Sequence, residues 1–404
     1  MQCGLLGRTL SYSYSPSIHS MLGNYSYILF EKEPEELEAF LKSGEFDGLN
    51  VTIPYKKAVI PYLDHLSPIA KRLGAVNTIV RKPDGTLIGH NTDYFGFSAM
   101  VAKSGVPVAG KKALVLGSGG ASNTAVAVLK ELGAQVVVIS RFGENNYSNL
   151  ELHRDAALIV NATPVGMFPN VDATPICLDG FPQLLGVLDL NYNPARTQLL
   201  LDAESRGLGA ENGLWMLVAQ AKESAEWFTG AIIPDGKIAE IHRSLASQME
   251  NIILIGMPGC GKSTVAKRLS QALNRPVVDA DEEICRIAGC TIPEIFAQGG
   301  EDAFRKLETQ VLRELGAMSG KIIATGGGCV TREENYPLLH RNGKIIWLTR
   351  ELSKLPTDGR PLSQITKMET MFEIRKPMYK RFADYTVSND GAAEETVAAI
   401  RRLL

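Results

Sequence analysis

The strongest signal for chemistry in this sequence is a glycine-rich run that ends in a lysine and a hydroxyl. Residues 256–264, GMPGCGKST, match the spacing GxxxxGK[ST] in full, between an apolar run at 251–255 and a helix-like segment. Glycines free backbone N–H groups to wrap a β-phosphate, while Lys262 neutralises charge and Ser263 coordinates Mg²⁺. We therefore predict a loop that binds a nucleoside triphosphate, ATP, through Gly256, Gly259, Cys260, Gly261, Lys262, Ser263 and Thr264.

Two carboxylates follow at the end of the next apolar run. Asp279 and Asp281 are two residues apart, so on an extended segment they share one face. One could hold Mg²⁺ through water while the other receives a substrate hydroxyl; a polar strand end is the alternative. Arginines downstream of a phosphate loop, together with a glycine triplet after an apolar run, favour a clamp for anions. These residues are Arg305, Arg360, Arg375 and Gly326–Gly328.

A second glycine-rich loop, GSGGAS at 117–122, lies between an apolar run and a helix-like segment. Gly117 allows a tight turn, and Gly119 lets a pyrophosphate approach the backbone at the helix N-terminus. Ser122 occupies the position of the third glycine in GxGxxG, so the motif by itself is imperfect. The strand–loop–helix–strand pattern around the motif supports the prediction. The next apolar run ends at Arg141, a basic residue that suits the 2′-phosphate of NADP. The alternative is an ordinary βαβ turn with a surface arginine.

Polar residues also gather in loops of the N-terminal segment. Three hydroxyls, two amides, a lysine and an aspartate suit a small hydroxylated acid, but Ser, Asn and Asp favour turns anyway. A lone lysine is usually solvated, so spacing alone gives Lys56 no role. Lys57 stands beside it, and alternation along a strand would turn only one of the two inward. The candidates are Ser13, Ser15, Asn50, Thr52, Lys56, Asn77 and Asp93.

Composition limits the function classes. The 404 residues carry 42 Lys+Arg against 44 Asp+Glu, a net charge of −2, so no general attraction to nucleic acid or an anionic membrane is expected. No window approaches the ~18–20 apolar residues of a membrane span, and the N-terminus lacks a secretory pattern. Six scattered cysteines indicate neither a disulfide framework nor a zinc site. We expect a cytoplasmic enzyme with reduced cysteines; a homodimer cannot be read either way.

Two nucleotide loops about 140 residues apart predict two separate α/β nucleotide domains. The N-terminal half shows strand-like runs at 2–7, 48–54, 77–82 and 87–91, then the first glycine-rich unit, then helices. The expected bounds are 1–97 plus 213–248 for a substrate lobe, 98–212 for a cofactor lobe, and 250–404 for a phosphate-loop domain. A helix runs almost directly into the strand at 251–255, without a flexible linker.

Seven ordered motifs across residues 1 to about 247 resemble shikimate dehydrogenase: SYSPSIH, NVTIPYK, GAVNT, NTDYFG, GSGGAS, NATPVGM and NGLWMLVAQA. The resemblance implies a two-lobed fold with a Rossmann-like NADP lobe, and NADPH-dependent reduction of 3-dehydroshikimate to shikimate. Lys56 and Asp93 would be the catalytic pair, with Lys56 supplying a proton or cation to the carbonyl oxygen. The substrate would also contact Ser13, Ser15, Asn50, Thr52, Asn77 and Gln220. The cofactor would lie along Gly117, Gly119, Gly120, Ala121, Ser122, Arg141, Asn161, Ala162, Thr163 and Gly213, with Met216 at the lobe junction.

Residues 250–404 resemble shikimate kinase, a P-loop α/β domain. The resemblance implies that Asp281, Arg305, Arg375 and Gly326–Gly328 bind shikimate, with Asp281 on its hydroxyls and the arginines on its carboxylate. Ser263 and Asp279 would serve Mg²⁺, and Arg360, in a lid, would reach the transferring phosphate. Together with Lys262, Asp281 and Arg360 would form the catalytic set. The predicted product is shikimate 3-phosphate, so the two halves would catalyse consecutive steps.

The sequence also departs from both families. The crossover FGENNYSNLELHRDA is shorter than the helical one usual in the dehydrogenases, and Ser140-Arg141-Phe142 stands where they carry Asn-Arg-Thr. The lid segment LTRELSKLPTDGRPLS is also short. Three alternatives stay open: a weakly active or regulatory N-terminal module that binds shikimate or quinate, quinate oxidation with NAD, and a gluconate-type kinase.

Overall fold

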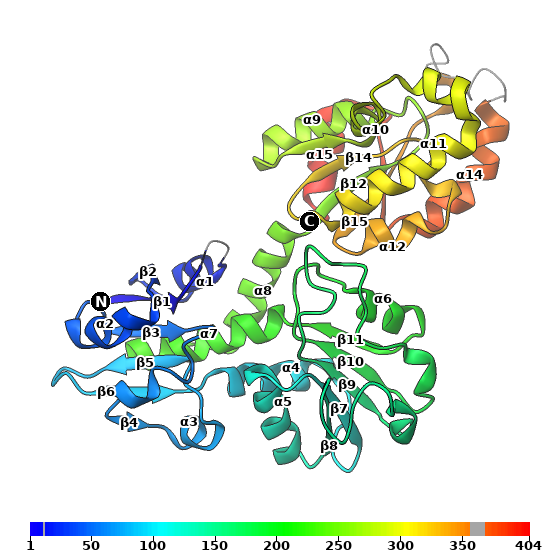
Figure 1. Cartoon of the computed structure of the whole chain (residues 1–404). Coiled ribbons are helices and arrows are strands. Elements are labelled where there is room, and N and C mark those ends of the chain that lie inside the picture. The colour runs from blue at the N-terminus through cyan, green and yellow to red at the C-terminus, as the bar shows by residue number, and fades with distance from the viewer. Residues whose placement is uncertain (11–12, 356–367) are drawn as a thin grey trace. The chain divides into compact units, whose positions relative to one another are not determined.

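The structure, a computed structural model, describes residues 1–10, 13–355 and 368–404. Contacts between Cα atoms divide the chain into two compact units (Figure 1). The first unit comprises Met1–Gly166, Asp172–Tyr192 and Asp202–Leu245. The second comprises Met167–Val171, Asn193–Leu201 and Ala246–Leu404.

The N-terminal lobe of the first unit is built on a mixed six-stranded sheet in the order β2-β1-β3-β5-β6-β4. Its strands are β1 (Gln2–Gly7), β2 (Ser26–Glu31), β3 (Gly48–Val51), β4 (His65–Leu66), β5 (Thr78–Arg81) and β6 (Leu87–His90). Helices α1 (Ser15–Leu22), α2 (Leu37–Ser43) and α3 (Pro68–Leu73) lie between them. The four predicted strands are confirmed as β1, β3, β5 and β6, whereas β2 and β4 were not predicted.

The second lobe of this unit is a parallel five-stranded sheet in the order β11-β10-β9-β7-β8. Its strands are β7 (Lys112–Leu116), β8 (Gln135–Ile139), β9 (Leu158–Asn161), β10 (Gly186–Asp189) and β11 (Gly209–Asn212), with helices α5 (Gly120–Glu131) and α6 (Gln198–Ser205). The crossover from β8 to β9 contains only a 3₁₀ turn, η3 (Leu150–His153), as its short length suggested. The glycine-rich loop joins β7 directly to α5, the arrangement of a dinucleotide-binding turn.

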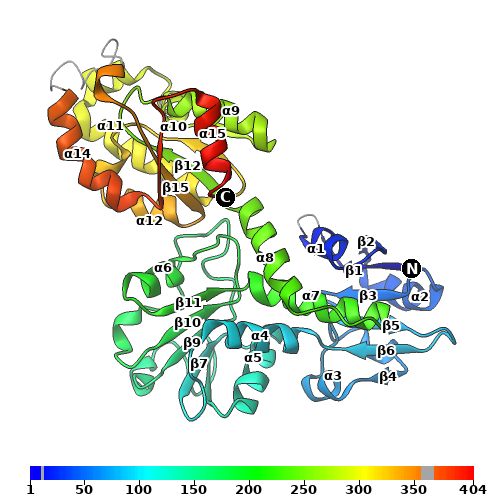
Figure 2. The same cartoon turned by 180° about the vertical axis from the view of Figure 1, so that it is seen from behind.

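Two long helices connect these lobes. Helices α4 (Asp93–Ser104) and α7 (Leu214–Thr229) pack against each other, and Figures 1 and 2 show both between the two sheets. Helix α8 (Gly236–Met249) follows and is separated from β12 by a single residue, which confirms the predicted direct entry into that strand. The lobes are therefore joined by helices rather than by a single loop.

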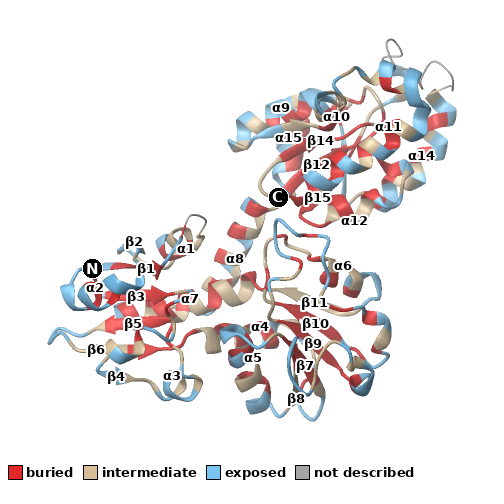
Figure 3. Ribbon diagram, viewed as in Figure 1, coloured by how far each residue is buried: buried red, intermediate tan, exposed pale blue. Residues whose placement is uncertain are grey.

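The second unit has a parallel sheet in the order β13-β14-β12-β15-β16, whose three central strands are mostly buried (Figure 3). The strands are β12 (Asn251–Ile255), β13 (Val277–Asp279), β14 (Ile322–Ala324), β15 (Gly343–Thr349) and β16 (Tyr385–Ser388). The helices are α9 (Lys262–Leu273), α10 (Ala280–Ala288), α11 (Ile292–Ala317), α12 (Asn335–His340), α14 (Met368–Phe382) and α15 (Ala393–Arg401). Helix α11 is kinked at Gly300, where φ is +70°.

Short 3₁₀ turns complete the described elements: η1 (Pro34–Glu36), η2 (Ile60–Tyr62), η4 (Leu178–Gly180), η5 (Cys329–Thr331) and η6 (Leu352–Lys354). Among the residues that the structure describes, no helix combines the length and the apolar character needed to cross a membrane.

Two candidate active sites

The first candidate site is a pocket of about 550 Å³ in the first unit. It collects all eight residues predicted for the substrate and its chemistry, although they come from positions between 13 and 220. These are Ser13, Ser15, Asn50, Thr52, Lys56, Asn77, Asp93 and Gln220. Three residues predicted on the cofactor side or at the lobe junction also line it, namely Ala121, Gly213 and Met216. The pocket therefore brings residues predicted for the substrate together with residues predicted for the cofactor or the lobe junction.

A lysine–carboxylate pair stands in this pocket. Lys56 Nζ donates a 2.6 Å hydrogen bond to Asp93 Oδ2, and the two side chains are only 30% and 16% exposed. Asp93 is the first residue of α4. The expectation that Lys56 ends a strand is wrong, because β3 stops at Val51 and a turn follows. That turn, rather than strand alternation, separates the half-buried Lys56 from the exposed Lys57.

Sequence reasoning missed part of the pocket wall. Leu190 and Tyr192 follow β10 and line the pocket. Their segment contains none of the motifs on which the predictions were based. The Tyr192 ring makes an edge contact with Tyr14, at 6.2 Å between centroids. Burial raises the pKa of the Tyr192 phenol, so the phenol stays neutral at physiological pH. The wall between the lobes is thus partly aromatic.

The glycine-rich loop has the geometry of a pyrophosphate site. Gly117 has a φ of +102°, and no atom lies near the position of a Cβ on Gly119 or Gly120, which leaves the backbone open at the start of α5. Ser122, in the third motif position, is buried and donates a 2.7 Å hydrogen bond to the carbonyl of Gly117, so it closes the turn. The exposed Arg141 follows β8 by two residues.

Residues 161–163, which were predicted to line the cofactor, abut this loop. A Cβ on Gly117 would stand 3.0 Å from Thr163 Cγ2 and 3.2 Å from the carbonyl of Ala162. Asn161 is fully buried; its Nδ2 donates to Asp189, and its Oδ1 accepts from the Thr163 hydroxyl at 2.6 Å. The Asn161 side chain therefore holds the segment together from within, and Ala162 and Thr163 form its more exposed part.

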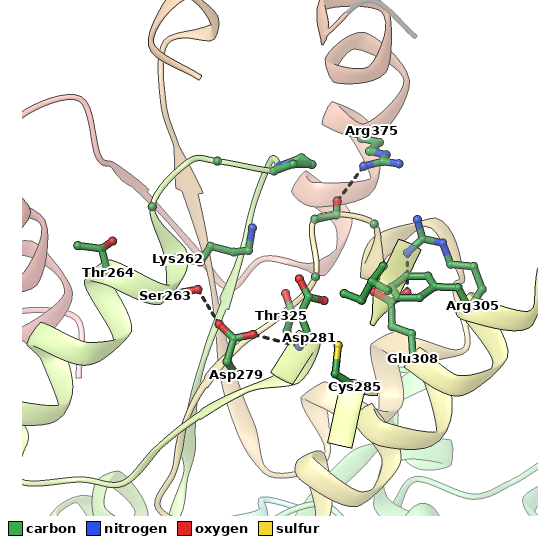
Figure 4. Close-up of a pocket in the computed structure, with 18 of the residues that line it drawn as sticks. Lys262, Ser263, Thr264, Asp279, Asp281, Cys285, Arg305, Glu308, Thr325 and Arg375 are labelled. Carbon is green, nitrogen blue, oxygen red and sulfur yellow. Dashed lines mark hydrogen bonds and ion pairs between the residues drawn. The ribbon is translucent and has the colours of Figure 1, made fainter. Parts of the chain in front are cut away.

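The second candidate site is a pocket of about 930 Å³ in the second unit. It is lined by the predicted residues Gly259, Gly261, Lys262, Ser263, Thr264, Asp279, Asp281, Arg305, Gly326, Gly327, Gly328 and Arg375 (Figure 4). Gly256 and Cys260 support the loop from outside the pocket: the carbonyl of Gly256 accepts from Lys262 Nζ, and that of Cys260 accepts from Asn389 Nδ2. Arg360 lies outside the described residues.

The phosphate loop presents a cation and two groups that fit Mg²⁺. Lys262 is 8% exposed, and its Nζ donates to the carbonyls of Gly256 at 3.0 Å and Met257 at 3.2 Å, so the ammonium lies over the loop. Ser263 Oγ donates to Asp279 Oδ2 at 2.6 Å. A hydroxyl beside a carboxylate is an all-oxygen donor set, the kind that Mg²⁺ prefers.

The predicted extended pair of carboxylates is wrong at Asp281. Strand β13 ends at Asp279, and Asp281 belongs to the first turn of α10. Asp279 Oδ1 accepts a 3.0 Å hydrogen bond from the Asp281 backbone N–H and so caps that helix. Both carboxylates still line the pocket because the chain turns between them; Asp279 faces Ser263 and Asp281 faces the glycine triplet (Figure 4).

Two buried arginines line the other end of the pocket. Arg305 is 5% exposed and donates from Nη1 to Glu308 Oε2 at 2.7 Å, while Arg375 is 7% exposed and donates to the carbonyl of Gly327 at 3.1 Å. A Cβ on Gly328 would collide with the Arg305 guanidinium, which explains the glycine at that position. The arginines are therefore held in place before any anion binds.

No role was predicted for Glu308, which follows Arg305 by three residues on α11. Its side chain is fully buried, and burial raises the pKa of its carboxyl while the Arg305 charge opposes that rise. Its Oε1 and Asp281 Oδ1 both lie within 3 Å of where a Cβ on Gly326 would stand. The i,i+3 spacing from Arg305 on a helix was the available signal for this ion pair.

Comparisons with known proteins agree with this division. A family model for shikimate kinase matches residues 258–404, and a model for the shikimate dehydrogenase substrate binding domain matches residues 5–79. The NADP(+) shikimate dehydrogenase of Clostridium perfringens is 34% identical over 264 residues, which cover 60% of this chain and 97% of that protein.

Solved structures give the same result. A chorismate mutase/shikimate 5-dehydrogenase fusion protein from Clostridium acetobutylicum matches with a TM-score of 0.58 and 34% identity, over 60% of this chain and 96% of the other. Shikimate 5-dehydrogenase from Thermus thermophilus, in complex with NADP(H) and shikimate, matches with a TM-score of 0.56 and 33% identity, over 60% and 99%. The chain therefore belongs to the shikimate dehydrogenase family and carries a shikimate kinase domain in the same polypeptide.

Proposed function

We propose that the first unit reduces 3-dehydroshikimate to shikimate with NADPH and that the second unit phosphorylates shikimate to shikimate 3-phosphate with ATP and Mg²⁺. The observation that carries the proposal is the presence of two pockets in one chain. One pocket holds the Lys56–Asp93 pair among hydroxyls and amides, and the other holds buried arginines beside a phosphate loop. In this proposal residues 1–97 plus 213–248 form the substrate lobe, 98–212 the NADP lobe and 250–404 the kinase domain. A cytoplasmic location is part of the same proposal.

In the reduction, bound NADPH supplies the hydride that the ketone carbon accepts. Negative charge then develops on the carbonyl oxygen, and Lys56 neutralises it by donating a proton from Nζ. Asp93, whose carboxylate lies 2.6 Å from Nζ, orients that ammonium. Ser13, Ser15, Asn50, Thr52, Asn77 and Gln220 bind the acid and its hydroxyls, and Asn161 supports the segment beside the nicotinamide through Thr163.

The residues present fit a dinucleotide with a 2′-phosphate. The open backbone at Gly119 and Gly120 stands at the start of the 12-residue helix α5, where the N–H groups favour an anion. Arg141 is exposed at the end of the neighbouring strand and supplies the positive charge for the 2′-phosphate. NADP(H) is therefore the cofactor that the proposal names.

In the phosphorylation, ATP bound with Mg²⁺ supplies the phosphoryl group. Lys262 and the loop N–H groups would neutralise the phosphate oxygens, and Ser263 and Asp279 would hold the cation. Arg305 and Arg375 grip the carboxylate of shikimate while Asp281 accepts the proton of the attacking hydroxyl.

A coupled assay tests both halves at once. Purified full-length protein is given 3-dehydroshikimate, NADPH, ATP and Mg²⁺; NADPH oxidation is followed by absorbance and shikimate 3-phosphate by mass spectrometry. We expect NADPH consumption and accumulation of the phosphorylated product. Shikimate binding without NADPH consumption would contradict the dehydrogenase assignment and favour a binding module. Failure to phosphorylate added shikimate, with gluconate accepted instead, would contradict the kinase assignment.

A further inference from the structure

A buried group of hydroxyls lies directly behind the first pocket. Thr78 of β5, Thr92 before α4 and Ser224 of α7 are 0%, 2% and 0% exposed. Their oxygens are 2.9 Å apart for Thr78 and Ser224, 2.9 Å for Thr92 and Ser224, and 3.1 Å for Thr78 and Thr92. Three elements that are distant in sequence thus bring their hydroxyls together in one triad, each oxygen within hydrogen-bond distance of the other two.

This triad bonds to both amide side chains of the pocket. Asn50 Nδ2 lies 2.8 Å from Ser224 Oγ and 3.3 Å from Thr78 Oγ1. Asn77 Nδ2 lies 3.1 Å from Thr92 Oγ1, and Asn77 Oδ1 accepts from Thr78 Oγ1 at 3.2 Å and from the Thr92 backbone N–H at 2.7 Å. Neither asparagine can rotate without leaving a buried polar atom unpaired, which costs far more than a surface hydrogen bond.

Asn50 is held from a second side as well. Tyr27 donates from its hydroxyl to Asn50 Oδ1 at 2.8 Å, and its ring stacks on the buried His19 at 4.0 Å between centroids. Ser224 in turn donates to the carbonyl of Gln220, one turn earlier on α7, and Gln220 itself lines the pocket. The network therefore reaches three residues that line the pocket, Asn50, Asn77 and Gln220.

We propose that Thr78 and Ser224 are positioning residues for the substrate: they do not touch it, but they fix the orientation of the Asn50 and Asn77 amides that do. The inference rests on the proposed dehydrogenase function. It adds that selectivity for a polyhydroxylated acid depends on side chains behind the pocket wall. Loss of a hydroxyl frees an amide to rotate, so substrate binding weakens while the cofactor site is unaffected.

The test compares two substitutions at Thr78. Thr78→Val keeps the shape and removes the hydroxyl, whereas Thr78→Ser keeps the hydroxyl. In the oxidation of shikimate by NADP⁺, we expect Thr78→Val to raise the KM for shikimate about tenfold, the value for one buried polar partner lost. The KM for NADP⁺ should stay within about twofold of wild type, and Thr78→Ser should restore most of the shikimate affinity.

Ser224→Ala, which removes a single oxygen, is the second variant. It should likewise raise the KM for shikimate and leave the KM for NADP⁺ nearly unchanged. Val80→Ala, two positions along β5 and outside the network, is the control for a general loss of stability and should leave both KM values unchanged. The wild-type rate in the same assay tests the proposed function separately.

The proposal is overturned if both hydroxyl-removing variants, folded by circular dichroism, keep the wild-type KM for shikimate. It is also overturned if both KM values rise together, or if Thr78→Ser is as impaired as Thr78→Val. Should Thr78→Val fail to fold, Ser224→Ala decides the question alone.

Discussion

The ammonium of Lys56 lies 2.6 Å from the carboxylate of Asp93, although the residues are 37 positions apart and belong to different elements. A turn after β3 presents one and the first residue of α4 presents the other. The pair is partly shielded from water and lines the substrate pocket. The ammonium is a candidate proton donor because of its position in the pocket beside Asp93, since a lysine exposed on the surface would have no such role.

Replacing Lys56 by alanine should therefore remove the proton donor from the reduction. We expect kcat for the dehydrogenase reaction to fall by about 10²–10⁴-fold, the usual contribution of a positioned acid. Phosphorylation of added shikimate should continue at the wild-type rate. The matched control is Lys57→Ala, because Lys57 is adjacent to Lys56 and its side chain is exposed; equal loss in both variants would contradict the assignment.

Arg305→Ala should weaken binding of shikimate to the kinase. The guanidinium is buried and pre-positioned by Glu308, and a charge-assisted hydrogen bond is worth about 1.5–3 kcal/mol, so the KM for shikimate should rise roughly ten- to a hundredfold. Initial rates at varied shikimate and saturating ATP measure it. Lys306→Ala changes an exposed neighbour and should have no such effect; an unchanged KM in Arg305→Ala would place the carboxylate elsewhere.

Ser263→Ala should raise the Mg²⁺ concentration that the kinase reaction requires. The hydroxyl lies 2.6 Å from Asp279, and its loss removes one of two predicted oxygen partners of the cation. We expect the Mg²⁺ concentration for half-maximal rate to rise by about tenfold, with activity partly recovered at saturating Mg²⁺. A fall in rate that no Mg²⁺ concentration reverses would argue against a metal role. Lys267→Ala, on the same helix, is the control.

His90 should make the stability of the first unit depend on pH. Burial and, to a smaller extent, the positive charge of Lys82 lower the pKa of this imidazole from 6.5 to about 4; the ring stacks on Trp227. Because the folded pKa is depressed, the stabilisation is complete above pH 6.5 and is lost as the pH falls toward 4. The loss amounts to about 3 kcal/mol when complete.

His90→Phe keeps a ring against Trp227 and cannot take up a proton, so it should retain more stability at low pH. Urea unfolding above pH 6.5 and midway between the two pKa values measures the difference. His65→Phe, at an exposed position, should keep the full wild-type loss. His19 and His242 also have lowered pKa values, so their protonation would add to the loss of stability. A wild-type free energy of unfolding that does not change over this pH range would therefore contradict the prediction.

Much of the fold was predictable because its elements carry local signals. The run NIILI before a phosphate loop and the run KALVL before GSGGAS are short, apolar and followed by glycines, and both are strands of parallel sheets. Strand β2 escaped prediction because SYILFE is an edge strand, mostly exposed on both faces, so hydrophobic alternation is weak. Strand β4 has only two residues, too few for any period.

The candidate sites were predictable as sets of residue types but not as geometry. Asp281 shows why: DAD after an apolar run looks extended, but Asp279 caps a helix that begins at Ala280. Thr78 and Ser224 are 146 positions apart, and no spacing rule connects them. Buried hydroxyl networks arise from tertiary packing, so the sequence alone does not reveal them.

Helix α8 has a consequence for any attempt to study the two activities separately. Its residues up to Leu245 belong to the first compact unit and those from Ala246 to the second, and both Leu245 and Met249 are buried. A fragment that ends or starts anywhere in this helix would lose backbone hydrogen bonds such as that from Glu250 to Ala246, and would uncover apolar side chains. Low stability or activity of an isolated half would then result from the disrupted helix at its terminus. Point variants of the intact polypeptide are therefore the sounder way to assign each reaction to its pocket.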